Sequence, residues 1–124
     1  MTSTEYYDIV ITVPSIINWN DYNKELKAVE DESNVLNFKV KNLPIKTSIG
    51  NKCYVCWRGN IVGWMKISGL VNNNFICSTT GKHWTGNFIQ RTGSFNYLEI
   101  PIPMKGFQGF RYINNFKNNK YELF

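Results

Sequence analysis

The sequence lacks any apolar run close to the roughly 20 residues that a membrane-spanning helix needs, which argues against an integral membrane protein. Residues 1–7 are polar and do not form a basic stretch followed by an apolar one, so we expect no secretory signal. Three cysteines are an odd number, which fits a reducing compartment better than a disulfide framework. These absences predict a cytoplasmic location.

Groups that carry catalysis are also scarce. The only histidine is His83, and the chain after residue 34 offers only Glu99 and Glu122 as carboxylates to orient it as a general base. The phosphate-binding pattern G-x-x-x-x-G-K-[ST] is absent. We therefore lean against an enzyme. A fold that brings Asp8 or Glu99 to His83 would instead indicate a small hydrolase or nuclease, and this alternative stays open.

The cysteines do not predict a metal site. Cys53 and Cys56 form one C-x-x-C pair, whereas a zinc site needs about four ligands, and Cys77 with His83 adds little. On a strand, residues three apart point to opposite faces, so these two thiols cannot hold one ion without a bulge. A redox-active C-x-x-C opens a helix, and this one lies in a predicted strand. We expect neither a metal nor a cofactor.

Charge is distributed unevenly along the chain. Residues 1–34 hold seven of the nine acidic residues and two lysines, whereas the remainder holds twelve lysines or arginines and two acids. A basic segment rich in aromatic residues suits an anionic partner, and nucleic acid is the commonest. Charge that serves only solubility would give the same distribution, so composition alone leaves both interpretations open.

A length of 124 residues with 43% hydrophobic and 15% aromatic residues fits one globular domain, residues 1–124. Asn18 or Asn20 can cap a helix that ends near Glu30. The apolar residues of this segment recur at helical spacing and form one face: Trp19, Tyr22, Leu26 and Val29.

Short alternating or β-branched segments predict the strands, at residues 6–13, 35–40, 52–57, 61–68, 97–102 and 110–113. The turn at Arg58-Gly59-Asn60 predicts a hairpin, and Gly63 in its second arm indicates a bulge or a close backbone approach. We predict loops at the remaining glycine- or asparagine-rich segments: residues 42–48, 72–74, 79–94 (with a short strand possible at 87–91) and 104–109, with a polar tail after 113.

One early helix among many short strands predicts the α+β class, with a mostly antiparallel, strongly twisted sheet or partly closed barrel that the helix covers. The alternating pattern of a doubly wound parallel sheet is absent.

Residues 49–70, IGNKCYVCWRGNIVGWMKISGL, resemble the signature hairpin of the PUA-like superfamily. Its ASCH and EVE domains carry Gly-Asp, a strand, a tight turn, Ile-Val-Gly and a second strand. Here Gly50-Asn51 stands where Gly-Asp is usual, and Ile61-Val62-Gly63 matches. The order of elements extends the resemblance over residues 6–70. It implies a pseudo-barrel with one or two short helices, whose cleft often receives RNA or a nucleobase, sometimes a modified one held among aromatic side chains.

One departure limits what the resemblance implies. ASCH domains usually carry a G-x-K-x-x-E-x-R motif, and residues 30–41 of this chain contain neither Gly nor Arg. The ribonuclease or amidohydrolase activity of some ASCH proteins is therefore not expected here.

Three segments contain residues suited to nucleic acid. In the loop predicted at 79–94, a base can stack on Trp84 while Lys82 or Arg91 meets a phosphate, with His83 beside them. In residues 105–112, Gln108 can read a base edge and Arg111 can pair with phosphate. At the hairpin, Trp57, Arg58 and Trp64 can form part of an aromatic cage. For each tryptophan, ordinary core packing is the alternative.

These features together predict a module that binds RNA, DNA or a modified nucleobase through a basic, aromatic-lined cleft. The residues expected to line that cleft are Trp57, Arg58, Trp64, Lys82, His83, Trp84, Arg91, Gln108 and Arg111. The alternatives are a hydrolase or nuclease that uses His83, and a protein-interaction module or homodimer that uses an exposed aromatic patch. No membrane partner is expected.

Overall fold

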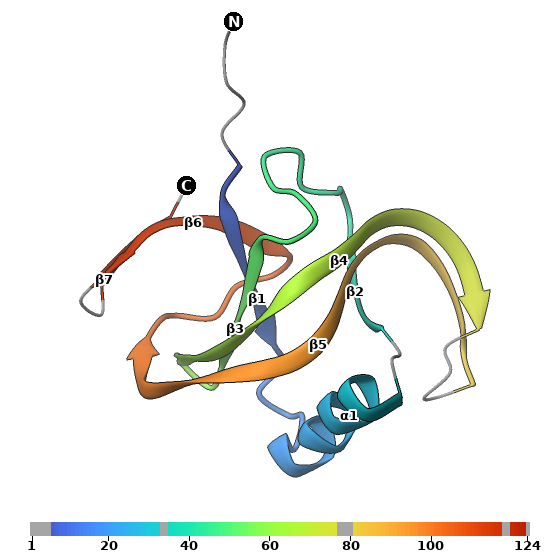
Figure 1. Ribbon diagram of the computed structural model, residues 1–124, viewed down its shortest axis with the longest axis horizontal. Coiled ribbons are helices and arrows are strands. Elements are labelled where there is room, and N and C mark those ends of the chain that lie inside the picture. The colour runs from blue at the N-terminus through green and yellow to red at the C-terminus, as the bar shows by residue number, and fades with distance from the viewer. Residues whose placement is uncertain (1–5, 33–34, 77–80, 118–119, 124) are drawn as a thin grey trace, which may run out of the picture.

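The computed structural model describes residues 6–32, 35–76, 81–117 and 120–123, which form a mixed sheet with one helix against one face (Figure 1). The elements in chain order are β1 (Asp8–Val13), α1 (Trp19–Glu32), β2 (Leu36–Val40), β3 (Lys52–Trp57), β4 (Asn60–Ile76), β5 (His83–Pro103), β6 (Phe110–Lys117) and β7 (Lys120–Leu123). The seven strands are ordered β2-β5-β4-β3-β1-β6-β7.

Every pair of neighbouring strands is antiparallel except β1 and β3, which are parallel. The α+β class with a mostly antiparallel sheet is therefore confirmed. Among the described residues the sheet is open, with β2 and β7 at its two edges, so the barrel closure expected from the sequence is not found. In Figure 1, β4 and β5 run side by side as a long curved ribbon, and α1 lies below the sheet next to β5.

Helix α1 forms as its sequence predicts. The Asn18 side chain accepts a hydrogen bond of 2.8 Å from the backbone N–H of Asn20, which caps the first turn. Tyr22, Leu26 and Val29 are buried against the sheet. No helix in the described ranges is long and apolar enough to cross a membrane.

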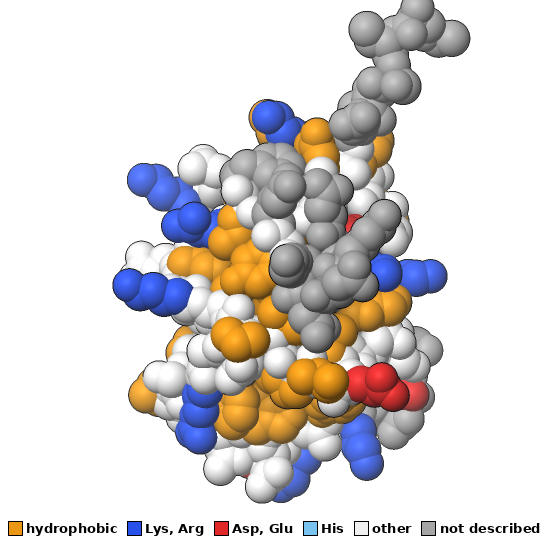
Figure 2. Space-filling model, turned by 90° about the vertical axis from the view of Figure 1, so that its left-hand side faces the viewer, with side chains coloured by type: hydrophobic (Ala, Val, Ile, Leu, Met, Phe, Trp, Pro, Cys, Tyr) orange, Lys and Arg blue, Asp and Glu red, His pale blue; other side chains and the backbone are white. Residues whose placement is uncertain are grey.

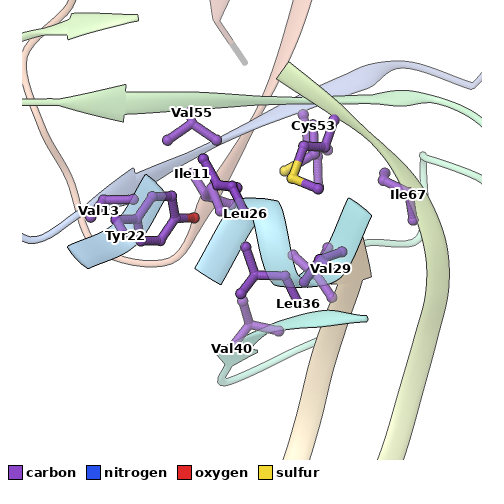
Figure 3. Packing of buried hydrophobic residues seen from close by; sticks show 13 residues of the cluster. Ile11, Val13, Tyr22, Leu26, Val29, Leu36, Val40, Cys53, Val55 and Ile67 are labelled. Atoms are coloured by element: carbon purple, nitrogen blue, oxygen red, sulfur yellow. The ribbon is translucent and has the colours of Figure 1, made fainter. Parts of the chain in front are cut away.

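The larger core cluster lies between α1 and the sheet (Figure 3). Strand alternation sends Ile11, Cys53 and Met65 to this face, which we call the α1 face. Burial of each such side chain contributes about 1.5–3 kcal/mol to folding. The members that the strands and the helix contribute are Ile9, Ile11, Val13, Tyr22, Leu26, Val29, Leu36, Val40, Cys53, Val55, Met65, Ile67 and Ile89.

A smaller cluster lies on the opposite face, which we call the far face. Its buried members are Val10, Tyr54, Cys56, Ile61, Ile102, Met104 and Ile113. Half-buried side chains from the 104–109 loop and from β7, namely Phe107, Tyr121 and Leu123, pack over it. Cys53 and Cys56 therefore point to opposite faces, as predicted, and cannot bind one ion together.

The predicted hairpin of β3 and β4 is confirmed. Trp57 pairs with Asn60, and the two residues between them, Arg58 and Gly59, have φ angles of 48° and 83°. Positive φ at both central residues is the requirement of a type I′ turn, which matches the twist of the flanking strands. A side chain at Gly63 would collide with the Phe95 ring, and strand pairing shifts on either side of Gly63. The bulge and the close approach are thus both present.

The second half of the chain is more extended than the sequence predicts. Residues 72–74 and most of 79–94 were expected to be loops, but they lie in β4 and β5, which pair as far as Ile76 and His83. The glycines that indicate loops lie within β5 instead. Gly86 and Gly93 adopt φ angles of 133° and 84°, and the register of pairing between β4 and β5 shifts at three places. Likewise, β6 and β7 replace the expected polar tail.

Candidate functional site

Trp57 and Arg58 connect the hairpin tip to the segment that precedes α1. The Trp57 indole N–H donates to the Ile17 carbonyl at 3.2 Å, and Arg58 Nε donates to the Ser15 carbonyl at 3.1 Å. The Arg58 guanidinium lies 4.4 Å from the centre of the Trp57 ring. A shallow cavity of about 250 Å³ remains here, lined by Asn18, Trp19, Asn20, Trp57 and Arg58.

The expected partnership of Trp57 and Trp64 is wrong. Trp57 packs against the cluster on the α1 face, whereas Trp64 packs against the cluster on the far face. The cause is a bulge in β4: Val55 pairs with Gly63 and Cys56 with Ile61, so Val62 is an extra residue that turns Trp64 to the face opposite Trp57.

Lys82 and His83 lie at the other end of the hairpin made by β4 and β5. Both are exposed, and His83 pairs in register with Ile76. Asp8, one carboxylate that could have oriented His83, instead accepts hydrogen bonds at the start of β3, from the Asn51 side chain at 3.1 Å and from the Lys52 backbone at 2.8 Å. The Trp84 side chain lies outside the described part of the structure. Gln108 is exposed in the 104–109 loop.

Trp64 lies in a groove of about 410 Å³ on the far face, which we call the Trp64 groove. Its lining residues are Trp64, Lys66, Thr92, Gly93, Ser94 and Asn96. Lys52 lies beside it, with Nζ 4.6 Å from the centre of the Trp64 ring. Lys52 and Lys66 are directly opposite each other in the pairing of β3 and β4, and like charges so placed repel. The groove and its border therefore carry two positive charges next to one aromatic ring.

A second groove, of about 380 Å³, lies where β6 and β7 meet the 104–109 loop. The lining residues of this groove are Met104, Lys105, Gly106, Phe107, Arg111, Tyr121 and Leu123. Within it, the Arg111 guanidinium lies 5.3 Å from the centre of the Phe107 ring. Figure 2 views the molecule from the side of β6 and β7 and shows apolar side chains in the centre with Lys and Arg side chains around the margin.

Arg91 is not on a loop at all. It lies in β5 with a side chain that is 1% exposed, at a cavity of about 370 Å³ between α1, β2 and β5, which we call the Arg91 cavity. Its Nη1 donates to the Tyr22 hydroxyl at 3.2 Å. Burial raises the pKa of Glu25, which shares this cavity, and the Arg91 charge opposes that rise.

The buried thiols and phenol offer no reactive group. Burial raises the pKa of Cys53 to about 11 and that of Tyr54 to about 12, and it also raises the pKa of Cys56. The thiols are therefore protonated near neutral pH and are poor nucleophiles. Within the described ranges, no three His, Cys, Asp or Glu side chains are grouped so that they could hold a metal ion.

Comparison with known protein families, curated proteins and solved structures found no match to this chain. The functional argument therefore depends on the geometry of its own residues. Among the predicted residues whose side chains are described, Trp64, Arg91 and Arg111 line three separate cavities, and Lys82, His83 and Gln108 line none of the four described above.

Sequence reasoning missed Lys52 and Lys66 on the far face, and Tyr22 and Glu25 at the Arg91 cavity. The pattern Trp64-x-Lys66 places both side chains on one face of a strand, so the first lysine could have been found by alternation. Lys52 requires the register of the hairpin, which the bulges shift.

Proposed function

We propose that this protein binds single-stranded RNA or DNA on the far face of its sheet, with the Trp64 groove at the centre. The observation that carries the proposal is one aromatic ring, Trp64, accompanied by two lysines on a face that α1 does not cover. A base that stacks on such a ring contributes about 1–3 kcal/mol to binding, and neighbouring lysines neutralise the phosphates.

The position of Lys52 suits an exchange on binding. Lys52 is half-buried, and a cation over an aromatic ring is worth about 0.5–1 kcal/mol at an exposed site and about 2 kcal/mol when desolvated, against about 1–3 kcal/mol for the stacking of a base. A base can therefore displace Lys52 from the Trp64 ring, and the ammonium then meets a phosphate of the same strand. Occupation of the groove by an anion also relieves the repulsion between Lys52 and Lys66.

The distribution of charge between the two faces also favours the far face as the binding surface. Helix α1, on the opposite face, contains five acidic residues and two lysines, which disfavours a polyanion there. On the far face, the groove with Lys105 and Arg111 adds two more cations and the Phe107 ring. A single-stranded nucleic acid that extends from the Trp64 groove toward β6 would thus meet a second aromatic and basic site.

Fluorescence anisotropy with labelled oligo(U) and oligo(dT) tests the proposal. We expect Trp64→Ala to weaken binding about 5- to 150-fold, the range for one lost stack. The slope of the logarithm of the binding constant against the logarithm of the salt concentration should become shallower by about 1.4 in the double variant Lys52→Gln/Lys66→Gln. This is about 0.7 for each lost phosphate contact.

The matched control is Lys24→Gln/Lys27→Gln, which removes the same charge from exposed positions on α1. This control should leave both affinity and salt dependence nearly unchanged. Absence of binding at tens of micromolar and low salt, or equal effects of the two double variants, would overturn the proposal. Circular dichroism of each variant separates loss of binding from loss of fold.

The PUA-like relationship, with its pseudo-barrel, also stays a proposal. The support is limited to the two glycines of the resembling motif. Gly50 has a φ angle of 96°, and a side chain at Gly63 would collide with its neighbours, so the backbone conformation or the packing requires glycine at both positions. For the alternative functions, a hydrolase or nuclease and an interaction module or homodimer, we find no specific support in the geometry.

A further inference from the structure

The Arg91 cavity lies on the α1 face, away from the groove proposed for nucleic acid, and its lining is mixed in a specific way. One part is apolar: Val13, Pro14, Ile17, Leu36 and Phe38. The other part is polar and includes both signs of charge: Asp21, Tyr22, Glu25, Asn37 and Arg91. A volume of about 370 Å³ is at the small end of the range for small-molecule sites.

Arg91 is the feature that needs an explanation. A guanidinium has five N–H donors, yet among the described residues Arg91 donates only from Nη1 to the Tyr22 hydroxyl, and its buried Nε has no acceptor. Figure 3 shows the Tyr22 hydroxyl pointing into the space between α1 and the sheet. Burial of a guanidinium is costly, and the nearby Glu25 charge offsets only part of that cost, so the remaining donors of this side chain are available to a ligand.

The ligand should bring acceptor oxygens in a planar arrangement. A carboxylate matches a guanidinium in this way, because two parallel N–H···O bonds can form. The carboxylates that α1 contributes to the cavity set a second requirement for the ligand, which concerns its charge. Asp21 and Glu25 are four residues apart on α1 and so lie on one side of the helix, and both line the cavity. A simple anion on Arg91 would face these two carboxylates, whereas a molecule that also carries a cation would complement them.

We infer that the Arg91 cavity binds a small zwitterion of the α-amino-acid type, with its carboxylate on Arg91 and its ammonium toward Glu25 and Asp21. The apolar side chain of that ligand packs against Leu36 and Phe38, both of which line the cavity from β2. Asn37 of the same strand also lines the cavity and supplies an amide to the polar end.

Three probes of similar shape test this inference on the unaltered protein by two-dimensional amide NMR: L-phenylalanine, 3-phenylpropionate and 2-phenylethylamine. We expect L-phenylalanine to shift amide signals of α1, β2 and the part of β5 around Arg91. The other two probes lack the ammonium or the carboxylate, and each should bind about tenfold more weakly, as expected for one lost charge-assisted hydrogen bond.

Two variants assign the ends of the ligand. Glu25→Gln should reduce the preference for L-phenylalanine over 3-phenylpropionate, and Arg91→Met should weaken binding of both about tenfold. If Arg91→Met fails to fold, the comparison of the three probes on the unaltered chain still decides. Failure of L-phenylalanine to shift these signals at about 10 mM, or equal affinity for 3-phenylpropionate, overturns the inference. Trp64→Ala should leave L-phenylalanine binding unchanged, so this result is independent of nucleic-acid binding.

Discussion

The two faces of the sheet differ in where their positively charged side chains lie. The α1 face has the more extensive apolar packing, and it also encloses one arginine with a single hydrogen bond. The far face has a smaller cluster, and its cations stand at the edge of open grooves beside aromatic rings. This difference is the basis of our two proposals, a polyanion on the open grooves of the far face and a small ligand at the enclosed arginine.

Removal of core volume should give the largest effect and should rank the two faces. Ile11 on the α1 face is completely buried, and Ile102 on the far face is 4% exposed at the border of the smaller cluster. We expect Ile11→Ala to lower the free energy of unfolding by about 4 kcal/mol and Ile102→Ala by about 2 kcal/mol. Urea denaturation measures both, and an equal or reversed cost would refute the ranking.

Of the two buried cysteines, Cys53 on the α1 face should respond more strongly to alkaline pH than Cys56 on the far face. Burial raises the pKa of the Cys53 thiol from its ordinary value of about 9 to about 11. The folded state therefore retains a proton that the unfolded state loses, so this stability is complete below pH 9 and is lost as pH rises toward 11. The loss should be about 2–3 kcal/mol.

Valine variants at the two cysteines check this assignment. The pKa of Cys56 on the far face is also raised, but that thiol has compensating hydrogen bonds to Thr12 and the Gly59 backbone. Cys53→Val should flatten the decline of stability between pH 9 and 11 more than Cys56→Val does, in urea titrations at fixed pH. A larger effect at Cys56 would contradict the comparison.

The enclosed arginine should cost stability in the absence of ligand. We expect Arg91→Met to raise the free energy of unfolding by about 1 kcal/mol, because an apolar side chain of similar length replaces a buried guanidinium that makes one hydrogen bond among the described residues. Arg111→Met on the far face is the control and should change stability by less than about 0.5 kcal/mol, because Arg111 is exposed. Thermal unfolding compares the two. A strong loss of stability in Arg91→Met would show that the Tyr22 hydroxyl and the Glu25 charge already compensate burial of the guanidinium.

The smallest effect concerns the paired lysines of the far face. Lys66→Gln removes the repulsion with Lys52 and should raise stability by about 0.2–0.5 kcal/mol at low ionic strength. The gain should disappear in about 1 M salt, where charges more than about 3 Å apart are screened. Lys41→Gln, at an exposed position outside the strands, should show no such gain. A gain that persists in salt would assign the effect to packing.

The elements with local signals were predictable from the sequence. Asn18 and the spacing of Tyr22, Leu26 and Val29 specify α1, and Gly59 specifies the hairpin turn, because capping, periodicity and positive φ act within a few residues. The full length of β5 was not predictable, because Gly86 and Gly93 look like loop residues until pairing with β4 accommodates them.

The candidate sites were less predictable because they depend on tertiary packing. Nothing adjacent to Arg91 in the sequence indicates burial, since Tyr22 and Glu25 of α1 reach it only after the helix packs on β5. Trp57 and Trp64 were expected to share an aromatic cage, but the bulge at Val62 of β4 places them on opposite faces.

The parallel pairing of β1 with β3 has a consequence for synthesis of the chain. Strand β1 leaves the ribosome first, yet its neighbours are β3, about 40 residues later, and β6, which begins at Phe110. A nascent or truncated chain that stops before residue 110 leaves one side of Ile9, Val10 and Ile11 without backbone partners. Such an apolar strand edge can recruit other chains, so we expect premature termination products of this protein to aggregate rather than to persist as partly folded monomers.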